Sequence, residues 1–161
     1  MTFIIVGGVV EFDFSRILQI ADDLCKEGIL DAENTKAQIG HCNYKPKNYT
    51  SYCFVNGEQF HKDIDEADII ITHGGVGTLV YALKLGKKVI IFPRLQRFNE
   101  HLDDHQLDIS KMYSEKGYCM MATNKDELRA CIKQAGSFTP VPFISDNSKM
   151  TCIIENYLDR L

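Results

Sequence analysis

A run of glycines that follows an apolar segment is the part of this sequence best suited to bind a ligand. Residues 68–72, with three consecutive isoleucines, are typical of a buried strand, and His73, Gly74, Gly75, Val76, Gly77 and Thr78 follow them. Glycines let the backbone turn tightly and approach a ligand where a Cβ would be in the way. A helix that starts at such a turn presents unpaired N–H groups and a partial positive charge, which suit a diphosphate. We therefore expect residues 73–78 to bind a diphosphate, with His73 as a donor and Thr78 as the helix N-cap or a hydroxyl donor.

The same residues permit a simpler interpretation, in which the glycines serve only the packing between a strand and a helix. No Gly-Lys-Ser/Thr follows, so the run is not a P-loop, and it lacks the G-x-G-x-x-G spacing of the dinucleotide fingerprint. Gly7 and Gly8 end the first apolar segment, but the third glycine is missing there. Both interpretations of residues 73–78 stay open on this evidence.

A second segment, residues 93–106, is dense in hydrogen-bonding side chains. It follows the apolar run 89–92, so we expect it at the same edge of a sheet as the glycine run. Carboxylates and amides suit the hydroxyls of a sugar, and guanidinium groups complement phosphate. The candidate ligand-binding residues of this segment are Arg94, Arg97, Glu100, His101, Asp104 and Gln106.

The histidines of this segment permit a metal-binding alternative. His101 and His105 would share a helix face at i, i+4, and Asp103 and Asp104 would add oxygen ligands. No further strong ligand has a diagnostic spacing, so we expect no metal. The simplest interpretation is a solvated helix start with Asp103 or Asp104 as N-cap.

Composition restricts the class of protein. The chain has 161 residues and a net charge of −4, with its basic residues scattered, which argues against nucleic acid or anionic lipid as a direct partner. The first apolar run is too short for a signal peptide, and no stretch approaches the ~20 apolar residues of a membrane span. Six scattered cysteines without a C-x-x-C pair are typical of reduced, buried thiols in cytosol.

Short apolar runs alternate with helical periodicity along the chain. This alternation predicts one α/β domain over residues 1–161, with a Rossmann-like parallel sheet and helices on both faces. Such sheets bind ligands at the carboxyl ends of their strands. We expect strands at 3–6, 36–39, 51–55, 68–72, 89–92 and 118–122, helices at 13–26, 59–66, 78–85, 104–116 and 125–134, and an amphipathic C-terminal helix at 148–161.

Two segments of the chain resemble glycosyltransferase family 28. The first is residues 67–78; the second combines Phe92-Pro93-Arg94 with the long pattern Arg97-Phe98-x-Glu100-His101-x-x-Asp104-His105-Gln106. The resemblance extends from residue 3 to about 135. Within this family the chain is similar to small subunits of bacterial two-subunit capsular or exopolysaccharide glycosyltransferases. These resemble the catalytic subunit of the eukaryotic N-acetylglucosaminyltransferase that extends dolichol-linked sugar.

The resemblance implies a domain equivalent to the C-terminal half of a GT-B glycosyltransferase, which binds a UDP-sugar. Residues 73–78 would hold the UDP diphosphate, and the segment 94–106 would face the ribose and the sugar. The backbone at Phe54 and Val55 would meet the uracil. Transfer would be inverting and independent of metal or cofactor, and the sugar would be a hexose of the galactose, glucuronic acid or N-acetylglucosamine type.

The resemblance also implies a partner. A membrane-anchored subunit would bind a lipid-linked acceptor for surface polysaccharide synthesis and supply the catalytic base. The chain would be cytoplasmic and reach the inner face of the membrane through that partner, on which the tail 148–161 would dock unless it packs on its own sheet.

Two departures from the family pattern favour an alternative, a non-catalytic accessory subunit that stabilises a membrane-associated glycosyltransferase. Many relatives carry a ribose-binding Glu eight residues after the His, where this chain has Tyr81. They also have Gly-Thr-His after the first strand, where this chain has Gly7-Gly8-Val9. Glu11 is the residue of this chain that could replace the lost polar contact or act as the base.

Overall fold

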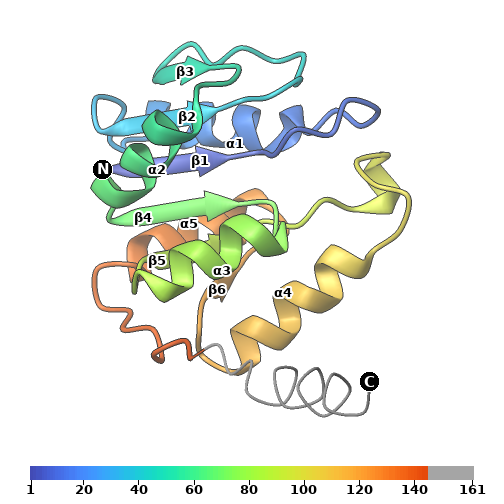
Figure 1. The fold of residues 1–161 in the computed structure, drawn as a ribbon. Helices are drawn as coiled ribbons and strands as arrows, with labels where there is room; N and C mark the ends of the chain where they lie inside the picture. The colour runs from blue at the N-terminus through green and yellow to red at the C-terminus, as the bar shows by residue number, and fades with distance from the viewer. Residues whose placement is uncertain (145–161) are drawn as a thin grey trace, which may run out of the picture.

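A parallel sheet of six strands organises residues 1–144, the part of the chain that the computed structural model describes (Figure 1). The strands lie in the order β3-β2-β1-β4-β5-β6, and every neighbouring pair is parallel. The strands are β1 Thr2–Ile5, β2 Thr35–Gln38, β3 Thr50–Tyr52, β4 Ile69–Thr72, β5 Lys88–Ile91 and β6 Met120–Met121. The helices are α1 Ser15–Lys26, α2 Gly57–Glu66, α3 Val76–Lys84, α4 His105–Glu115 and α5 Lys125–Gln134, with a 3₁₀ turn η1 at Gln96–Phe98.

The helices cover both faces of the sheet, because the central strands are apolar on both sides. Alternate residues of β1 point to opposite faces: Ile4 packs with α1 and α5, and Phe3 packs with α2 and α3. Both clusters are essentially closed to solvent. The expected Rossmann-like α/β fold with a parallel sheet is therefore confirmed.

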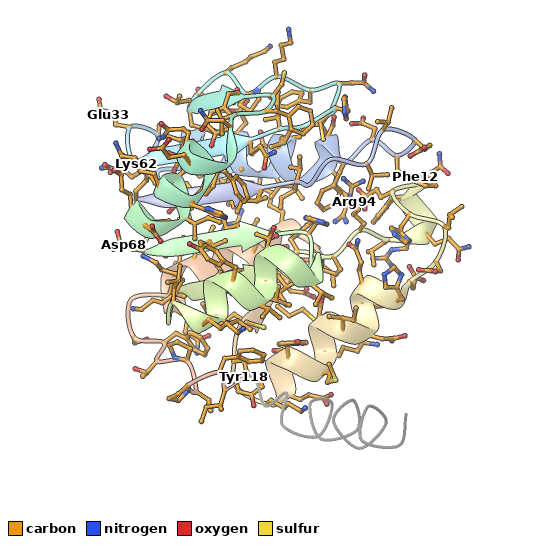
Figure 2. The ribbon with its side chains drawn as sticks, in the orientation of Figure 1. Phe12, Glu33, Lys62, Asp68, Arg94 and Tyr118 are labelled. Carbon is orange, nitrogen blue, oxygen red and sulfur yellow. The ribbon has the colours of Figure 1, made fainter. Side chains whose placement is uncertain are left out.

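The strand order reverses between β1 and β4, and this reversal defines where a ligand can bind. The chain runs from β1 outward to β3, returns to β4 beside β1, and then runs outward to β6. Loops that leave β1 and β4 diverge at their carboxyl ends, so they leave a crevice in open α/β sheets. Figure 2 places Phe12 and Arg94 at this edge of the sheet and Asp68 at the opposite edge.

Several boundaries differ from the sequence-based expectation. Helix α3 begins at Val76 with Gly75 as its N-cap, so the predicted N-cap role of Thr78 is wrong. Helix α1 begins at Ser15 instead of residue 13. Asp13 lies before the helix, because its Oδ1 accepts hydrogen bonds from the Ser15 amide at 3.2 Å and from the Ser15 hydroxyl at 2.6 Å. Strand β3 ends at Tyr52 and β6 has two residues, so both are shorter than expected. The amphipathic segment expected at 148–161 lies outside the described residues.

Within residues 1–144, no helix is long and apolar enough to cross a bilayer. The five cysteines of this part are free, and Cys53 is exposed whereas the other four are at least partly buried. The expectation of uniformly buried thiols is therefore wrong for Cys53, which follows the short edge strand β3.

A buried carboxylate on α1 fastens the loop between β2 and β3. Asp22 is fully buried, and it accepts hydrogen bonds from the Tyr44 hydroxyl, the Lys47 amide at 3.0 Å, and the Asn48 amide and side chain at 3.0 Å each. Burial alone would raise the pKa of Asp22, but these hydrogen bonds outweigh burial and hold the pKa below its usual value.

We predict that Asp22→Ala lowers the free energy of unfolding by about 3 kcal/mol, because it leaves buried loop amides without an acceptor. Urea denaturation at neutral pH measures this change. The adjacent Asp23 is half-exposed and pairs with Lys125 at the surface, so Asp23→Ala is the matched control and should change the same quantity by less than about 1 kcal/mol. Equal losses in the two variants would contradict the role of Asp22.

Candidate functional site

The loop that follows β4 places the His73 ring between two glycines at the reversal point of the sheet. A Cβ on Gly7, after β1, would lie 2.8 Å from the His73 ring, and a Cβ on Gly75 would lie 2.5 Å from its Nε2. Gly7 also has φ +83°, a conformation that L side chains rarely adopt. Both glycines are therefore required by the close approach of the imidazole, so part of the glycine run serves packing.

The environment of His73 keeps its imidazole neutral. Burial, with a contribution from the nearby charge of Arg94, lowers the pKa of His73 to about 4. Its Nδ1 lies 3.4 Å from the Ile5 carbonyl oxygen, to which an Nδ1–H donates. In that tautomer Nε2 carries the lone pair. The ring can then accept a hydrogen bond from a ligand; donating one, as the sequence suggested, requires the other tautomer.

The first turn of α3 presents free backbone donors. The amide of Leu79 bonds to the carbonyl of Gly75 at 3.0 Å and is the first one paired inside the helix. The preceding amides of Val76, Gly77 and Thr78 have no acceptor in the helix, and within residues 1–144 no side chain caps this end. Val76 and Gly77 are exposed and Thr78 is half-buried, so a ligand can reach these amides.

Arg94 brings a buried positive charge to the same edge. Its guanidinium donates to the carbonyl oxygens of Val6 at 2.8 Å, Phe12 at 3.0 Å and Glu100 at 3.2 Å. It also lies 4.8 Å from the centroid of the Phe14 ring. Burial lowers the pKa of Arg94, but a guanidinium stays charged at any physiological pH. Carbonyl dipoles do not cancel a net charge, so Arg94 contributes a positive charge that favours an anion, although the carboxylates of Glu100 and Asp13 act on it from nearby.

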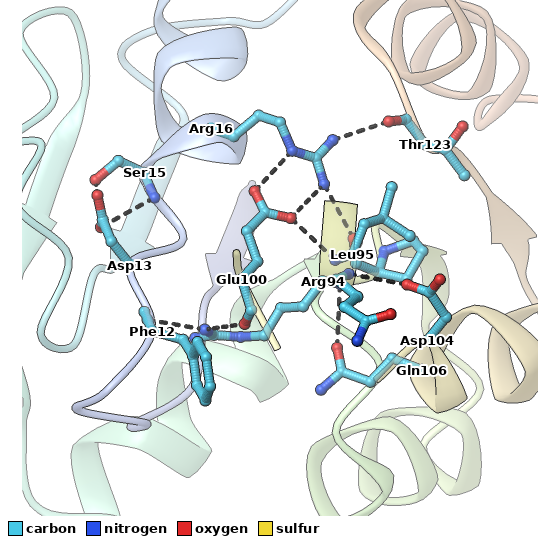
Figure 3. A network of polar contacts seen from close by, with 12 residues as sticks. Phe12, Asp13, Ser15, Arg16, Arg94, Leu95, Glu100, Asp104, Gln106 and Thr123 are labelled. Atoms are coloured by element: carbon cyan, nitrogen blue, oxygen red, sulfur yellow. Dashed lines mark hydrogen bonds and ion pairs between the residues drawn. The ribbon is translucent and has the colours of Figure 1, made fainter. Parts of the chain in front are cut away.

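The carboxylate of Glu100 is occupied by another arginine. It accepts from Arg16 through Nε and Nη2, both at 2.7 Å, and from the Leu95 amide at 3.0 Å (Figure 3). Arg16 also donates to the carbonyls of Thr123 at 2.8 Å and Pro93 at 3.1 Å. Because Glu100 bonds Arg16, it does not neutralise Arg94 by direct contact.

The polar segment 93–106 contains two kinds of residue, buried ones that bond within the protein and exposed ones. Arg94, Glu100 and Gln106 are buried and bond within the protein; Gln106 Oε1 accepts from the Arg94 amide at 3.1 Å. These bonds hold the loop in shape, while Arg94 Nε is buried without a hydrogen-bond partner in the described part of the chain. Asp104 and Arg97 are exposed, and Asp104 Oδ1 accepts from the Gln96 amide at 2.9 Å.

A cavity of about 270 Å³ opens between Asp104 and Arg97. It is also lined by Leu95, Leu107 and Thr123, of which the last two carried no signal in the sequence. Thr123 follows β6, far along the chain from the segment 93–106, so only the fold brings it there. A larger hollow of about 520 Å³ lies at the amino ends of β4 and β5, away from these groups.

The other expected site residues lie at the same edge or beside it. Phe54 follows β3 and is 46% exposed, and its ring contacts the His41 ring at a centroid distance of 4.9 Å. Val55 is half-buried next to it, and Glu11 is exposed in the loop after β1. Tyr81 packs on His61 of α2 at 4.9 Å and supplies no carboxylate.

The structure therefore defines an α/β domain with an uncapped helix start and a buried arginine at the reversal point of a parallel sheet. Comparison with known proteins identifies the family. The sequence profile of the glycosyltransferase family 28 C-terminal domain matches residues 2–140, and the chain belongs to this family.

Curated relatives carry one name, UDP-N-acetylglucosamine transferase subunit ALG13. The human protein is 26% identical over 146 residues, which are 87% of this chain and 12% of the human protein. The Candida albicans protein is 27% identical over 107 residues, which are 66% of this chain and 31% of that protein. The chain thus spans a third or less of the length of these two relatives.

Solved structures share the fold. An NMR solution structure of ALG13 superposes with a TM-score of 0.62 at 18% identity, covering 94% of this chain and 93% of that one. The glycotransferase of kitacinnamycin gives a TM-score of 0.58 at 18% identity, covering 84% and 35%. At this identity the similarity shows the fold, which is that of the C-terminal domain of GT-B glycosyltransferases.

We predict that His73 makes the protein less stable in mild acid. The folded-state pKa is about 4 and the ordinary value is 6.5, so the unfolded chain binds more protons between these values. The free energy of unfolding should fall as pH drops from 6.5 toward 4, by at most about 1.4 kcal/mol per pH unit from this group, and be unaffected by it above 6.5.

Urea denaturation of the wild type and His73→Gln from pH 4 to 7 measures this contribution. The variant should lose less stability over that range, and the exposed-site control His61→Gln should follow the wild type. Parallel pH profiles for wild type and His73→Gln would show that the folded protein does not hold the ring neutral.

Proposed function

We propose that this chain is the donor-binding catalytic part of a two-component inverting glycosyltransferase that uses a UDP-sugar. The observation that carries the proposal is the pairing of open amides at the start of α3 with the buried charge of Arg94. Both features favour an anion, and a diphosphate is the anion that the start of a helix at a switch point commonly binds.

The diphosphate contacts would stabilise the leaving group. As the bond from the sugar to UDP breaks, negative charge grows on the diphosphate oxygens. Amides of residues 76–78 and the field of Arg94 are fixed in place before the reaction, so they stabilise this charge without reorganising. We propose that transfer needs no metal for this reason. Neutral His73 would donate a hydrogen bond to the diphosphate in the tautomer that carries its proton on Nε2.

The remaining parts of the donor would lie along the same edge. The exposed Phe54 ring and the backbone at Val55 stand at the ends of β2 and β3, where a uracil ring would meet them. The cavity beside Asp104 and Arg97 offers an acceptor and a donor for sugar hydroxyls. Arg94, Glu100 and Gln106 would act by shaping this loop, and His101 would line its outer side.

A partner would complete the active site. Exposed apolar side chains stand at the open edge, among them Val10, which is 68% exposed, and Leu102, which is 74% exposed. Relatives are named as subunits of an N-acetylglucosamine transferase. We propose a membrane-anchored partner that binds a lipid-linked acceptor, supplies the base, and holds this chain at the cytoplasmic face. Glu11 is the candidate base on this chain. The sugar would be a hexose, and N-acetylglucosamine is the one that the relatives' name supports.

An accessory role without nucleotide is the second candidate. Tyr81 favours it, because this side chain packs on α2 where many relatives have a ribose-binding carboxylate. A scaffold has no use for open amides beside a buried charge, which favours the catalytic role. The two functions differ in whether the isolated chain binds UDP.

We predict that the isolated chain binds UDP, and that Gly75→Ala weakens this binding at least tenfold, about 1.4 kcal/mol. A Cβ at Gly75 would meet His73 Nε2 at 2.5 Å, so the ring and the loop must move off the start of α3. Isothermal titration calorimetry with UDP measures the change.

The matched control is Gly136→Ala, since a Cβ at Gly136 meets no atom within 4 Å and the residue lines the hollow at the opposite edge. It should bind UDP like the wild type. Circular dichroism and thermal unfolding establish that both variants are folded. Absence of UDP binding by the wild type at millimolar nucleotide would favour the accessory role, and equal binding by both variants would remove the diphosphate from this loop.

A further inference from the structure

The loop between η1 and α4 brings together three side chains that commonly bind metal ions. His101, Asp103 and His105 each offer one ligand atom, and these atoms lie within 4.8 Å of one another. The i, i+4 spacing of the histidines and two possible oxygen ligands, Asp103 and Asp104, were visible in the sequence; the structure places Asp103 with the two histidines. The turn after Glu100 places Asp103 between the two histidine rings. The Oδ1 atom of Asp103 contacts Nδ1 of both His101 and His105.

The hydrogen bonds of this cluster leave a position suited to a cation. The amide of Asp103 lies 3.3 Å from His101 Nδ1 and donates to it in the tautomer in which that nitrogen carries a lone pair. The carboxylate oxygen of Asp103 lies only 3.1 Å from the same nitrogen. Two acceptors that face each other repel unless a proton or a cation stands between them. A metal ion bound to both atoms would replace this repulsion by two coordinate bonds.

The cluster is held by its surroundings before any ion binds. The His101 ring is stacked on Phe12 at a centroid distance of 6.1 Å and an interplanar angle of 20°. Asp103 Oδ1 accepts from the amide of His105 at 3.1 Å, at the first residue of α4. Two ligands of a tetrahedral zinc ion, each about 2.1 Å from it, lie about 3.4 Å apart. Small rotations of His105 and Asp103, which are both exposed, would therefore bring the three atoms to that spacing.

The donor set selects the kind of ion. Two imidazoles and one carboxylate suit zinc and its neighbours in the first transition series, whereas magnesium and calcium prefer oxygen ligands throughout. The positive end of the α4 dipole opposes a cation here by about 0.3–1 kcal/mol. The charges of Asp103 and the adjacent Asp104 act in the opposite direction, so the dipole does not decide the outcome.

We propose that His101, Asp103 and His105 form a binding site for one divalent transition-metal ion, of the zinc type. Three protein ligands leave at least one coordination position for water or for an oxygen of a bound molecule. The site belongs to the loop before α4 and uses none of the amides at the start of α3. His101 is also proposed to lie beside the donor sugar, so Zn²⁺ binding is measured without nucleotide, and its failure would leave the diphosphate contacts at the start of α3 unaffected.

The experiment titrates the full chain, stripped of metal with EDTA and dialysed, with Zn²⁺ by calorimetry and with Co²⁺ by visible absorption. No nucleotide is present. We expect one equivalent of Zn²⁺ to bind, and a Co²⁺ spectrum without the near-ultraviolet charge-transfer band of a thiolate ligand. His105→Ala and Asp103→Asn should each weaken Zn²⁺ binding at least tenfold, since even indirect partners of a ligand commonly contribute that much.

Two variants control for other donors. His61→Ala removes an exposed histidine of α2, and Cys53→Ser removes the exposed thiol, so both should bind Zn²⁺ like the wild type. His105 and Asp103 are themselves exposed, so their variants should unfold at the wild-type temperature when no metal is present. The proposal is overturned if the wild type binds no Zn²⁺, if His105→Ala binds it unchanged, or if Cys53→Ser abolishes binding.

Discussion

Three carbonyl groups from two distant loops converge on one buried guanidinium, and the functional edge of the molecule depends on this contact. Arg94 stands just after β5, yet it bonds Val6 and Phe12 in the loop that leaves β1. It joins two loops that emerge from different strands, together with the stacking of Phe12 on His101. The contact also has an electrostatic result. A charge bonded only to dipoles keeps its field, and that field extends to the open amides of α3 and to the neutral ring of His73.

The two arginines of the site, Arg16 and Arg94, bond different groups of the same residue, Glu100. Arg16 donates two hydrogen bonds to the carboxylate of Glu100, and Arg94 donates one to the main-chain oxygen of the same residue. The pair Arg16–Glu100 is therefore electrically balanced and mainly structural, whereas Arg94 remains the source of potential. An exchange of these partners would place a carboxylate against Arg94 and cancel the attraction for an anion. Residue identity alone does not distinguish the two outcomes; the path of the loop does.

The sequence was sufficient for the architecture and for part of the site. Apolar strands buried on both faces, such as 68–72 and 89–92, allow little other than a covered parallel sheet, and the glycine run marks where the chain turns at its edge. The first residue of α3 could not be predicted from the sequence, because it depends on which carbonyl oxygen accepts the hydrogen bond of the Leu79 amide. The roles of Arg94 and Glu100 could not be read at all. Arg94 bonds Val6 and Glu100 bonds Arg16, each more than 80 residues away along the chain, and no spacing encodes such pairs.

The anchoring of the loop after β5 constrains how the protein can move. Through Arg16, this loop is joined to α1 and to the carbonyl of Thr123 after β6, while Arg94 joins it to the loop after β1. A segment tied at so many points cannot swing over a ligand as a hinged lid does. In the proposed two-component enzyme, closure around a bound molecule would then be a rigid-body approach of two separate proteins, and opening would require the two proteins to separate.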